Sequence, residues 1–129
     1  YPAGVRGKFS KQVPEHIVKN KLFRQSEWMT SHMRTCKYKL WKNVKRSDIV
    51  HENGNVYRMA GDLPVVFPML EMAEERSYFI EDIIYVYNRI NPLNEDKVNH
   101  GLQLSIDAEV RAKPKYKRLE DEILLRGSK

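Results

Sequence analysis

Apolar side chains recur at helical spacing in two stretches of the chain. Directly after Asp62 they fall at helical spacing, at Leu63, Val66, Phe67, Leu70 and Ala73. From residue 98 onward they occupy every fourth position, at Val98, Leu102, Ile106 and Val110. Such spacing gathers apolar side chains on one face of an α-helix. The pattern therefore predicts two amphipathic helices, one with Asp62 as its N-cap and a bend or restart at Pro68, and one that Pro114 ends.

Shorter elements are expected around these two helices. The stretch PEHIVKN (14–20) has a proline and an acidic residue in its first turn, which is typical of a short helix. Apolar residues within 38–41 and 119–124 predict two more short helices. The sequence NGN at 53–55 is a turn signal, which either closes a small hairpin or simply connects two elements.

One run predicts a β-strand. Residues 83–87 (IIYVY) are continuously β-branched and aromatic, as in a strand that is buried on both faces. A sheet needs several strands, so we expect the partner strands in another polypeptide or upstream of Tyr1. The expected fold class is therefore α/β, or α+β within this chain, with few short strands and packed helices.

Composition and charge narrow the classes of protein. With 41% hydrophobic and 31% charged residues, the chain has the balance of a folded domain and not of a disordered or collagen-like protein. No window approaches the roughly 18 apolar residues of a membrane span. The excess of 23 Lys and Arg over 17 Asp and Glu gives a net charge of +6, which favours anionic partners. No nucleic-acid-binding module is recognisable, so we expect a solvated basic face and not a nucleic-acid partner.

Length and cysteine content add two expectations. The 129 residues allow one domain at most, and a start at Tyr1 instead of Met indicates a processed, truncated or partial chain. The single cysteine, Cys36, has no partner for an internal disulfide, which favours a reducing compartment and a cytoplasmic location. We expect Cys36 to be a buried structural thiol and not a nucleophile.

Two stretches carry side chains suited to recognising a sugar or activating a hydroxyl. In WMTSHMRT (28–35), Trp28, His32 and Arg34 could bind a sugar ring by stacking and hydrogen bonding, or a phosphate. An edge strand with a hydrated polar face explains the same residues. In AGDLP (60–64), Asp62 could accept a proton from a hydroxyl, whereas an N-cap without a catalytic role is equally consistent.

A third stretch is the polar loop after the expected strand. Its Asn88, Arg89 and Asn91 could bind phosphate or hydroxyl groups, because α/β proteins place ligands where strands end. Alternatively, the asparagines support turns and the arginine is solvated. The remaining histidines have no partner at metal-ligand spacing, so we expect each at the surface: His16, His51 and His100.

Together these stretches resemble the C-terminal half of inverting, GT-A-type glycosyltransferases of family 2. The resemblance rests on WMTSHMRTCKYKLWKNV (28–44), MAGDLPVVFPMLEMA (59–73) and IIYVYNRINPLNEDKVN (83–99), in the order and separation of the family. It covers about residues 1–112, which would be the acceptor-side part of a GT-A domain. Residues 113–129 would then form a basic C-terminal helix and tail.

The resemblance implies transfer of a sugar from a nucleotide-sugar donor to an acceptor hydroxyl with inversion. Asp62 matches the general base of the family. Trp28, His32 and Arg34 match the stretch that lines the acceptor side and approaches the donor phosphates. Gly61 stands where many members have a glutamate, and Asn91 stands where many have a metal-contacting histidine.

The resemblance also implies components that this sequence does not contain. The family carries its nucleotide-binding strands and an Asp-x-Asp metal motif in the N-terminal half, and neither occurs here. A divalent metal, Mg²⁺ or Mn²⁺, is thus expected for the whole enzyme, with its main ligands absent from this chain, which should be inactive alone. The alternative is a small basic, non-enzymatic interaction module that binds RNA. The sequence carries no signal for an oligomeric state.

Overall fold

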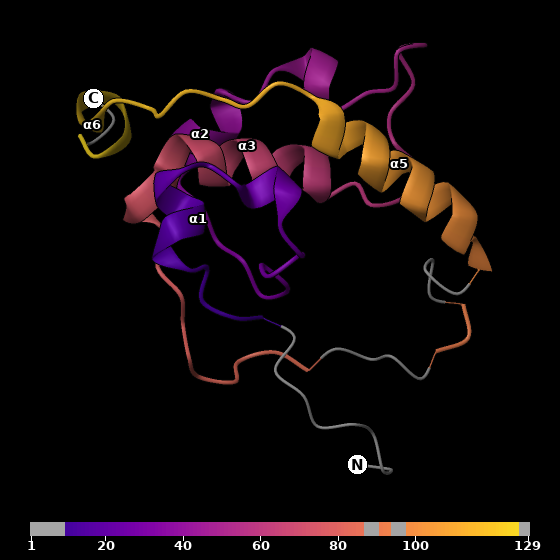
Figure 1. Cartoon of the computed structure of the whole chain (residues 1–129), viewed down its shortest axis with the longest axis horizontal. Helices are drawn as coiled ribbons and strands as arrows, with labels where there is room; N and C mark the ends of the chain where they lie inside the picture. The colour runs from indigo at the N-terminus through magenta and orange to yellow at the C-terminus, as the bar shows by residue number, and fades with distance from the viewer. Residues whose placement is uncertain (1–9, 87–90, 94–97, 127–129) are drawn as a thin grey trace.

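The computed structural model describes residues 10–86, 91–93 and 98–126 and is built from short helices around a central one (Figure 1). In chain order these are α1 (Glu15–Lys19), η1 (Phe23–Gln25), α2 (Tyr38–Lys42), η2 (Arg46–Asp48), α3 (Leu63–Ala73), η3 (Glu74–Arg76), α5 (His100–Ala112) and α6 (Asp121–Leu124), where η marks a 3₁₀ helix. The described residues form no strand, and their one β pairing is an isolated bridge between Val50 and Val56. None of the helices in these ranges is long and apolar enough to cross a bilayer. The chain is therefore helix-rich, and the strand part of the expected α/β class has little support.

The central helix, α3, is the one that the sequence predicts after Asp62. Its first turn contains Pro64, which costs no hydrogen bond there because the first N–H groups of a helix have no partner within it. Val66 and Phe67 are buried, as the apolar spacing predicts. The helix continues through Pro68 to Ala73, so the proline does not mark a restart.

The second predicted helix, α5, packs on α3 with its C-terminal half. The side chain of Asn99 caps its start, accepting a hydrogen bond from the Leu102 backbone N–H at 3.2 Å. Ile106 and Val110 are almost completely buried, whereas Val98 is 67% exposed. Thus only the second half of the apolar face that the sequence predicts contributes to the core.

Among the described residues, two groups of buried side chains form the core, and α3 contributes to both. The larger group joins α1, η1, α3 and α5 through Ile17, Phe23, Met29, Tyr57, Met59, Leu63, Phe67, Ile106 and Val110. The smaller one joins α2, the end of α3 and α6 through Leu40, Met72, Ala73 and Leu124. Because α3 contributes to both groups, it links α1, η1 and α5 on one side to α2 and α6 on the other.

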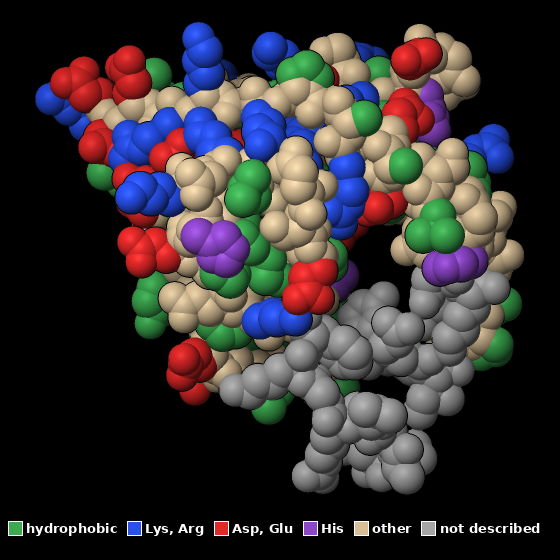
Figure 2. Space-filling model, viewed as in Figure 1, with side chains coloured by type: hydrophobic (Ala, Val, Ile, Leu, Met, Phe, Trp, Pro, Cys, Tyr) green, Lys and Arg blue, Asp and Glu red, His purple; other side chains and the backbone are tan. Residues whose placement is uncertain are grey.

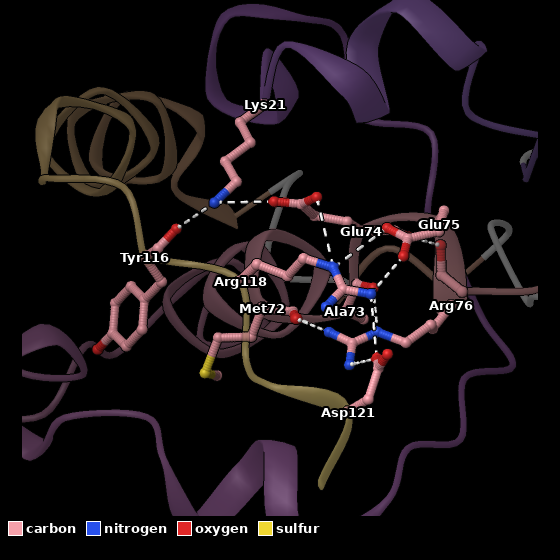
Figure 3. A network of polar contacts seen from close by, with 10 residues as sticks. Lys21, Met72, Ala73, Glu74, Glu75, Arg76, Tyr116, Arg118 and Asp121 are labelled. Atoms are coloured by element: carbon pink, nitrogen blue, oxygen red, sulfur yellow. Dashed lines mark hydrogen bonds and ion pairs between the residues drawn. The ribbon is translucent and has the colours of Figure 1, made fainter. Parts of the chain in front are cut away.

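The segment after α5 crosses the molecule and is held by charged side chains (Figure 3). Lys21, which follows α1, contacts both the end of α3 and the segment after α5. Its Nζ lies 2.9 Å from a Glu74 carboxylate oxygen and 3.1 Å from the Tyr116 carbonyl oxygen. Arg118 donates to Glu75 at 2.5 Å, and this hydrogen bond lowers the pKa of the Glu75 carboxyl to about 2. The described part of the expected tail (113–126) therefore packs against the rest of the chain.

Arg76 ties the same segment to the end of α3. It donates to the carbonyl oxygens of Met72 and Ala73 at 2.6 and 3.0 Å and thereby caps the helix. It also pairs with Asp121, the first residue of α6, at 2.9 Å. The last short helix that the sequence predicts is thus present as α6, and Arg76 holds its first residue at the end of α3.

The buried strand expected over 83–87 is wrong for residues 83–86. After η3 the chain leaves the helices and runs as an extended segment along one side (Figure 1). Ile83 and Val86 are 78% and 62% exposed, and Tyr87 lies outside the described residues. A strand buried on both faces needs neighbouring strands that pair with its edges and packed layers that cover its faces, and the described residues form no sheet of which 83–86 could be part.

The turn predicted at 53–55 closes a short hairpin-like loop. The His51 N–H donates to the Asn55 carbonyl at 2.8 Å, next to the bridge between Val50 and Val56. Gly54 adopts a φ of +84°, which residues with a side chain rarely adopt. Of the two roles open for this stretch, the small hairpin is the one observed.

Candidate functional site

Two segments far apart in sequence meet at the start of α3. Asp62 occupies the N-cap position, as predicted, but its side chain makes no capping hydrogen bond. Its Oδ2 lies instead 3.0 Å from Nη2 of Arg34, which belongs to the extended stretch before α2. Asp62 therefore stands at the predicted N-cap position, but its carboxylate pairs with Arg34 and does not accept a hydrogen bond from the backbone of the helix.

The guanidinium of Arg34 is held from several sides. Nη1 donates to the Thr30 carbonyl oxygen at 2.8 Å, and Nη2 lies 3.2 Å from Nε2 of His32. A guanidinium can only donate, so this contact is a hydrogen bond in the His32 tautomer that leaves Nε2 without a proton. The guanidinium carbon also lies 5.5 Å from the centroid of the Trp28 ring. These contacts fix the cation that faces Asp62.

Trp28 connects this cluster to the core. Its ring meets the ring of Phe67 on α3 edge to face, with centroids 5.4 Å apart. Phe67 is 2% exposed, so the indole rests on an immobile neighbour. Of the sequence-predicted residues, the structure thus brings together Trp28, His32, Arg34 and Asp62.

The third predicted stretch is only partly described. Asn88 and Arg89 lie outside the described residues. Asn91 is exposed, and its Oδ1 accepts a hydrogen bond from the Leu93 N–H at 3.0 Å, so its amide supports a turn. Tyr85, from the same stretch, stacks obliquely on His32 with ring centroids 5.5 Å apart. Sequence reasoning did not name Tyr85 as a site residue, although aromatic residues suit ligand contacts.

The cluster combines groups of different chemistry around an accessible carboxylate. The Asp62 side chain is 38% exposed, and that of Arg34 is 20% exposed. An accessible carboxylate can accept a hydrogen bond or a proton from a hydroxyl, and an indole face can pack on the C–H face of a sugar. The arrangement is therefore suited to a neutral, hydroxyl-rich ligand that packs beside an ion pair.

The residues described do not form a metal site. No group of three or more His, Cys, Asp or Glu side chains that could hold a metal ion occurs within 10–86, 91–93 and 98–126. At Asp62 the guanidinium of Arg34 already neutralises the carboxylate, which disfavours a second cation there. The side chains of the cluster thus do not fit the Mg²⁺ or Mn²⁺ that the resemblance implies for the whole enzyme.

A buried ion pair beneath the cluster was not anticipated from the sequence. Arg24 is 4% and Glu71 0% exposed, and Arg24 Nη2 donates to Glu71 Oε1 at 2.7 Å. Arg24 also donates to the Val110 carbonyl oxygen at 2.8 Å and lies 5.7 Å from the Phe67 ring centroid. The signal was available, because Glu71 follows Phe67 by four residues on the apolar face of α3, where a charged residue needs a buried partner.

The isolated histidines and the cysteine complete the comparison. His16 and His100 are exposed, as expected. His51 is instead half-buried, with its Nδ1 3.1 Å from Glu109 Oε2. Cys36 is exposed, so the expected buried thiol is wrong. It lies just before α2, where only Leu40 turns into the core.

The hydrogen bonds around Glu109 shift its ionisation. Burial alone would raise the pKa of the Glu109 carboxyl, but the hydrogen bonds from Tyr57 and His51 outweigh it and lower that pKa. Tyr57 donates to Glu109 at 2.9 Å, and burial together with this bond raises the pKa of the phenol. These side chains hold the 50–56 loop on α5, which is a structural role.

Comparison of the chain with known protein families, with curated proteins and with solved structures gave no match. The assignment of a function therefore rests on the residues and on their geometry.

Proposed function

We propose that this chain is the acceptor-side part of an inverting glycosyltransferase, with Asp62 as the general base. The observation that carries the proposal is the meeting of Trp28, His32 and Arg34 with Asp62 across 28 residues of sequence, counted from Arg34 (62 − 34). The same residues match the family 2 pattern in the sequence. Trp28 and His32 lie within six residues of Arg34, so the contact that joins separate parts of the chain is the ion pair between Arg34 and Asp62.

The reaction would use the cluster as follows. The carboxylate of Asp62 accepts the proton of the acceptor hydroxyl while the hydroxyl oxygen forms a bond to the anomeric carbon of the donor sugar. The bond from that carbon to the phosphate oxygen breaks, its electron pair leaves with the nucleoside diphosphate, and the configuration inverts. Arg34 holds the carboxylate in place and itself lies over the Trp28 ring.

We assign the binding site of the nucleotide-sugar donor to a part of the enzyme outside this chain. A pyrophosphate needs a divalent cation or several cationic and backbone N–H groups, and the guanidinium of Arg34 is already engaged by Asp62, Thr30 and His32. We therefore derive no step through a metal within the chain. The proposal includes that the chain needs a nucleotide-binding half to turn over.

The test is sugar transfer by a protein that carries this chain together with a nucleotide-binding half, as wild type and as Asp62→Asn. The variant should lose at least about a hundredfold in kcat while it binds the nucleotide-sugar donor equally well, because a general base contributes ~10²–10⁴-fold. Asp82→Asn, at an exposed carboxylate of the 77–86 segment, is the matched control and should keep full turnover. Equal turnover of Asp62→Asn and the wild type would refute the assignment.

A basic interaction module that binds RNA is the second candidate, favoured by one observation. Lys and Arg side chains gather in a band in the upper part of the view in Figure 2. Several of the basic residues nevertheless hold the fold together: Lys113 donates to the carbonyls of Ser47, Asp48 and Val50 at 3.1–3.3 Å. A salt titration of RNA binding decides, since an electrostatic module loses affinity steeply with salt and does not respond to a nucleotide sugar.

A further inference from the structure

A pocket opens between the start of α3 and the N-terminal half of α5. Its volume is about 350 Å³, which lies within the size range of small-molecule sites. Figure 2 shows the surface hollowed beside α5, on the side that faces the main body. The pocket is lined by Ala60, Leu63, His100, Gln103, Leu104 and Asp107.

The pocket lies next to the turn that carries the candidate base, Asp62. Ala60 and Leu63 stand on either side of the turn that holds Gly61 and Asp62. Asp62 itself is not among the lining residues, so a ligand in the pocket would lie next to the turn that carries the candidate base. An acceptor molecule needs this placement, because its reacting hydroxyl must come within hydrogen-bond reach of the base.

The polar side of the pocket is held in place. Gln103 and Asp107 lie on one face of α5, four residues apart. Arg111 Nε donates to both carboxylate oxygens of Asp107 at 3.0 and 2.9 Å, and its Nη1 donates to the carbonyl oxygens of Arg24 and Ser26. Each carboxylate oxygen can still accept another hydrogen bond, so Asp107 remains able to bind a hydroxyl.

The apolar side of the pocket suits the C–H face of a sugar ring. Leu63 is buried, whereas Leu104 is 56% exposed next to the pocket, although it belongs to a helix that buries Ile106. A neutral ligand with hydroxyl groups on one side and C–H groups on the other fits both walls.

We propose that this pocket binds a monosaccharide unit of the acceptor, with Asp107 and Gln103 hydrogen-bonded to its hydroxyl groups and Leu63 and Leu104 against its ring. The proposal rests on the proposed function, since it identifies the acceptor as a saccharide. Asp107 and Gln103 thereby become binding residues that the sequence alone did not select.

The experiment is a titration of the full 129-residue chain with the methyl glycosides of glucose, galactose, mannose and N-acetylglucosamine, followed by ¹H–¹⁵N NMR. At least one glycoside should shift the amide signals of residues 60–63 and 100–107. Asp107→Asn and Gln103→Ala should each weaken that binding about tenfold, the effect of losing a hydrogen bond to a charged or fixed polar group. Asp82→Asn and Gln25→Ala, at exposed positions, are the matched controls and should bind as the wild type does.

The outcomes separate this inference from the proposed function. Saccharide binding that depends on Asp107 and Gln103 supports the pocket, even if Asp62→Asn leaves transfer unchanged and the transferase assignment fails. Shifts outside the pocket, equal affinity of both variants and the wild type, or no binding of any glycoside would overturn it. If Asp107→Asn loses its helical circular dichroism, Gln103→Ala, which removes no ion pair, decides alone. Displacement of the glycoside by uridine diphosphate would assign the pocket to the donor and also overturn it.

Discussion

Replacing Glu71 by glutamine should destabilise the chain strongly although it removes no atom from the core. The side chain keeps its shape and loses its charge, which leaves the guanidinium of Arg24 buried at 4% exposure without a counter-ion. Breaking a buried ion pair by removing one partner costs about 3–5 kcal/mol, because the remaining charge has lost its water and gained nothing in return.

The geometry of this pair supports a cost within that range. Arg24 donates to both carboxylate oxygens of Glu71, at 3.1 and 2.7 Å, so two charge-assisted contacts weaken together. The Glu71 carboxylate also accepts from the Tyr116 N–H at 3.3 Å, which links it to the C-terminal segment. With an unfolding entropy of about 2.1 cal/mol/K per residue over 129 residues, the loss corresponds to a Tm lower by about 11–18 °C.

Urea unfolding followed by circular dichroism measures the effect as a change in the free energy of unfolding. The matched control is Glu27→Gln, since Glu27 pairs with Lys11 at the surface with side chains 67% and 55% exposed, and it should cost less than about 1 kcal/mol. The double variant Arg24→Met with Glu71→Leu should recover at least half of the loss, because no charge is then buried. If Glu71→Gln costs no more than Glu27→Gln, the pair is not desolvated as the structure has it.

Three further perturbations test other contacts. Burial and a hydrogen bond to Asp48 raise the pKa of Tyr116 from 10.0 to about 12, so the free energy of unfolding should fall as the pH rises through that interval. Tyr116→Phe should remove this part of the fall, as measured by urea unfolding at alkaline pH. The lowered pKa of Glu109 means that stability is present above its ordinary value of 4.5 and lost as the pH falls, so Glu109→Gln should flatten the acid limb of thermal unfolding; an unchanged limb would contradict this. Gly54→Ala should cost about 1 kcal/mol because φ is +84°, whereas Gly61→Ala, with open space around its Cα, should be nearly neutral in the same denaturation assay.

The helices were predictable where a periodic apolar face meets the core. The positions of Phe67 on α3 and of Ile106 and Val110 on α5 follow from spacing alone, and all three are buried. The strand expected at 83–86 is wrong because a high β propensity means only that residues suit a sheet, and the described residues form no sheet that this segment could join. Whether an apolar run is buried depends on its neighbours, and a run of residues does not specify them.

The candidate site shows the same division between local and long-range information. Which residue types could carry chemistry was evident in Trp28, Arg34 and Asp62. That the arginine faces the aspartate, and not a phosphate, follows from the path of the chain between them, which no local pattern encodes. The pocket residues Gln103 and Asp107 were missed because on a helix they are indistinguishable from ordinary solvent-facing polar residues.

The exposure of Cys36 has a practical consequence for work on this protein. It is the only cysteine of the chain and stands two residues after Arg34, close to the cluster at the start of α3. A maleimide-linked spin label or fluorophore can therefore be attached to the unaltered sequence at one defined position, where it would report ligand arrival at the ion pair. The same accessibility allows air oxidation to join two copies of the chain through a disulfide beside the site, so a reductant must be present whenever binding is measured.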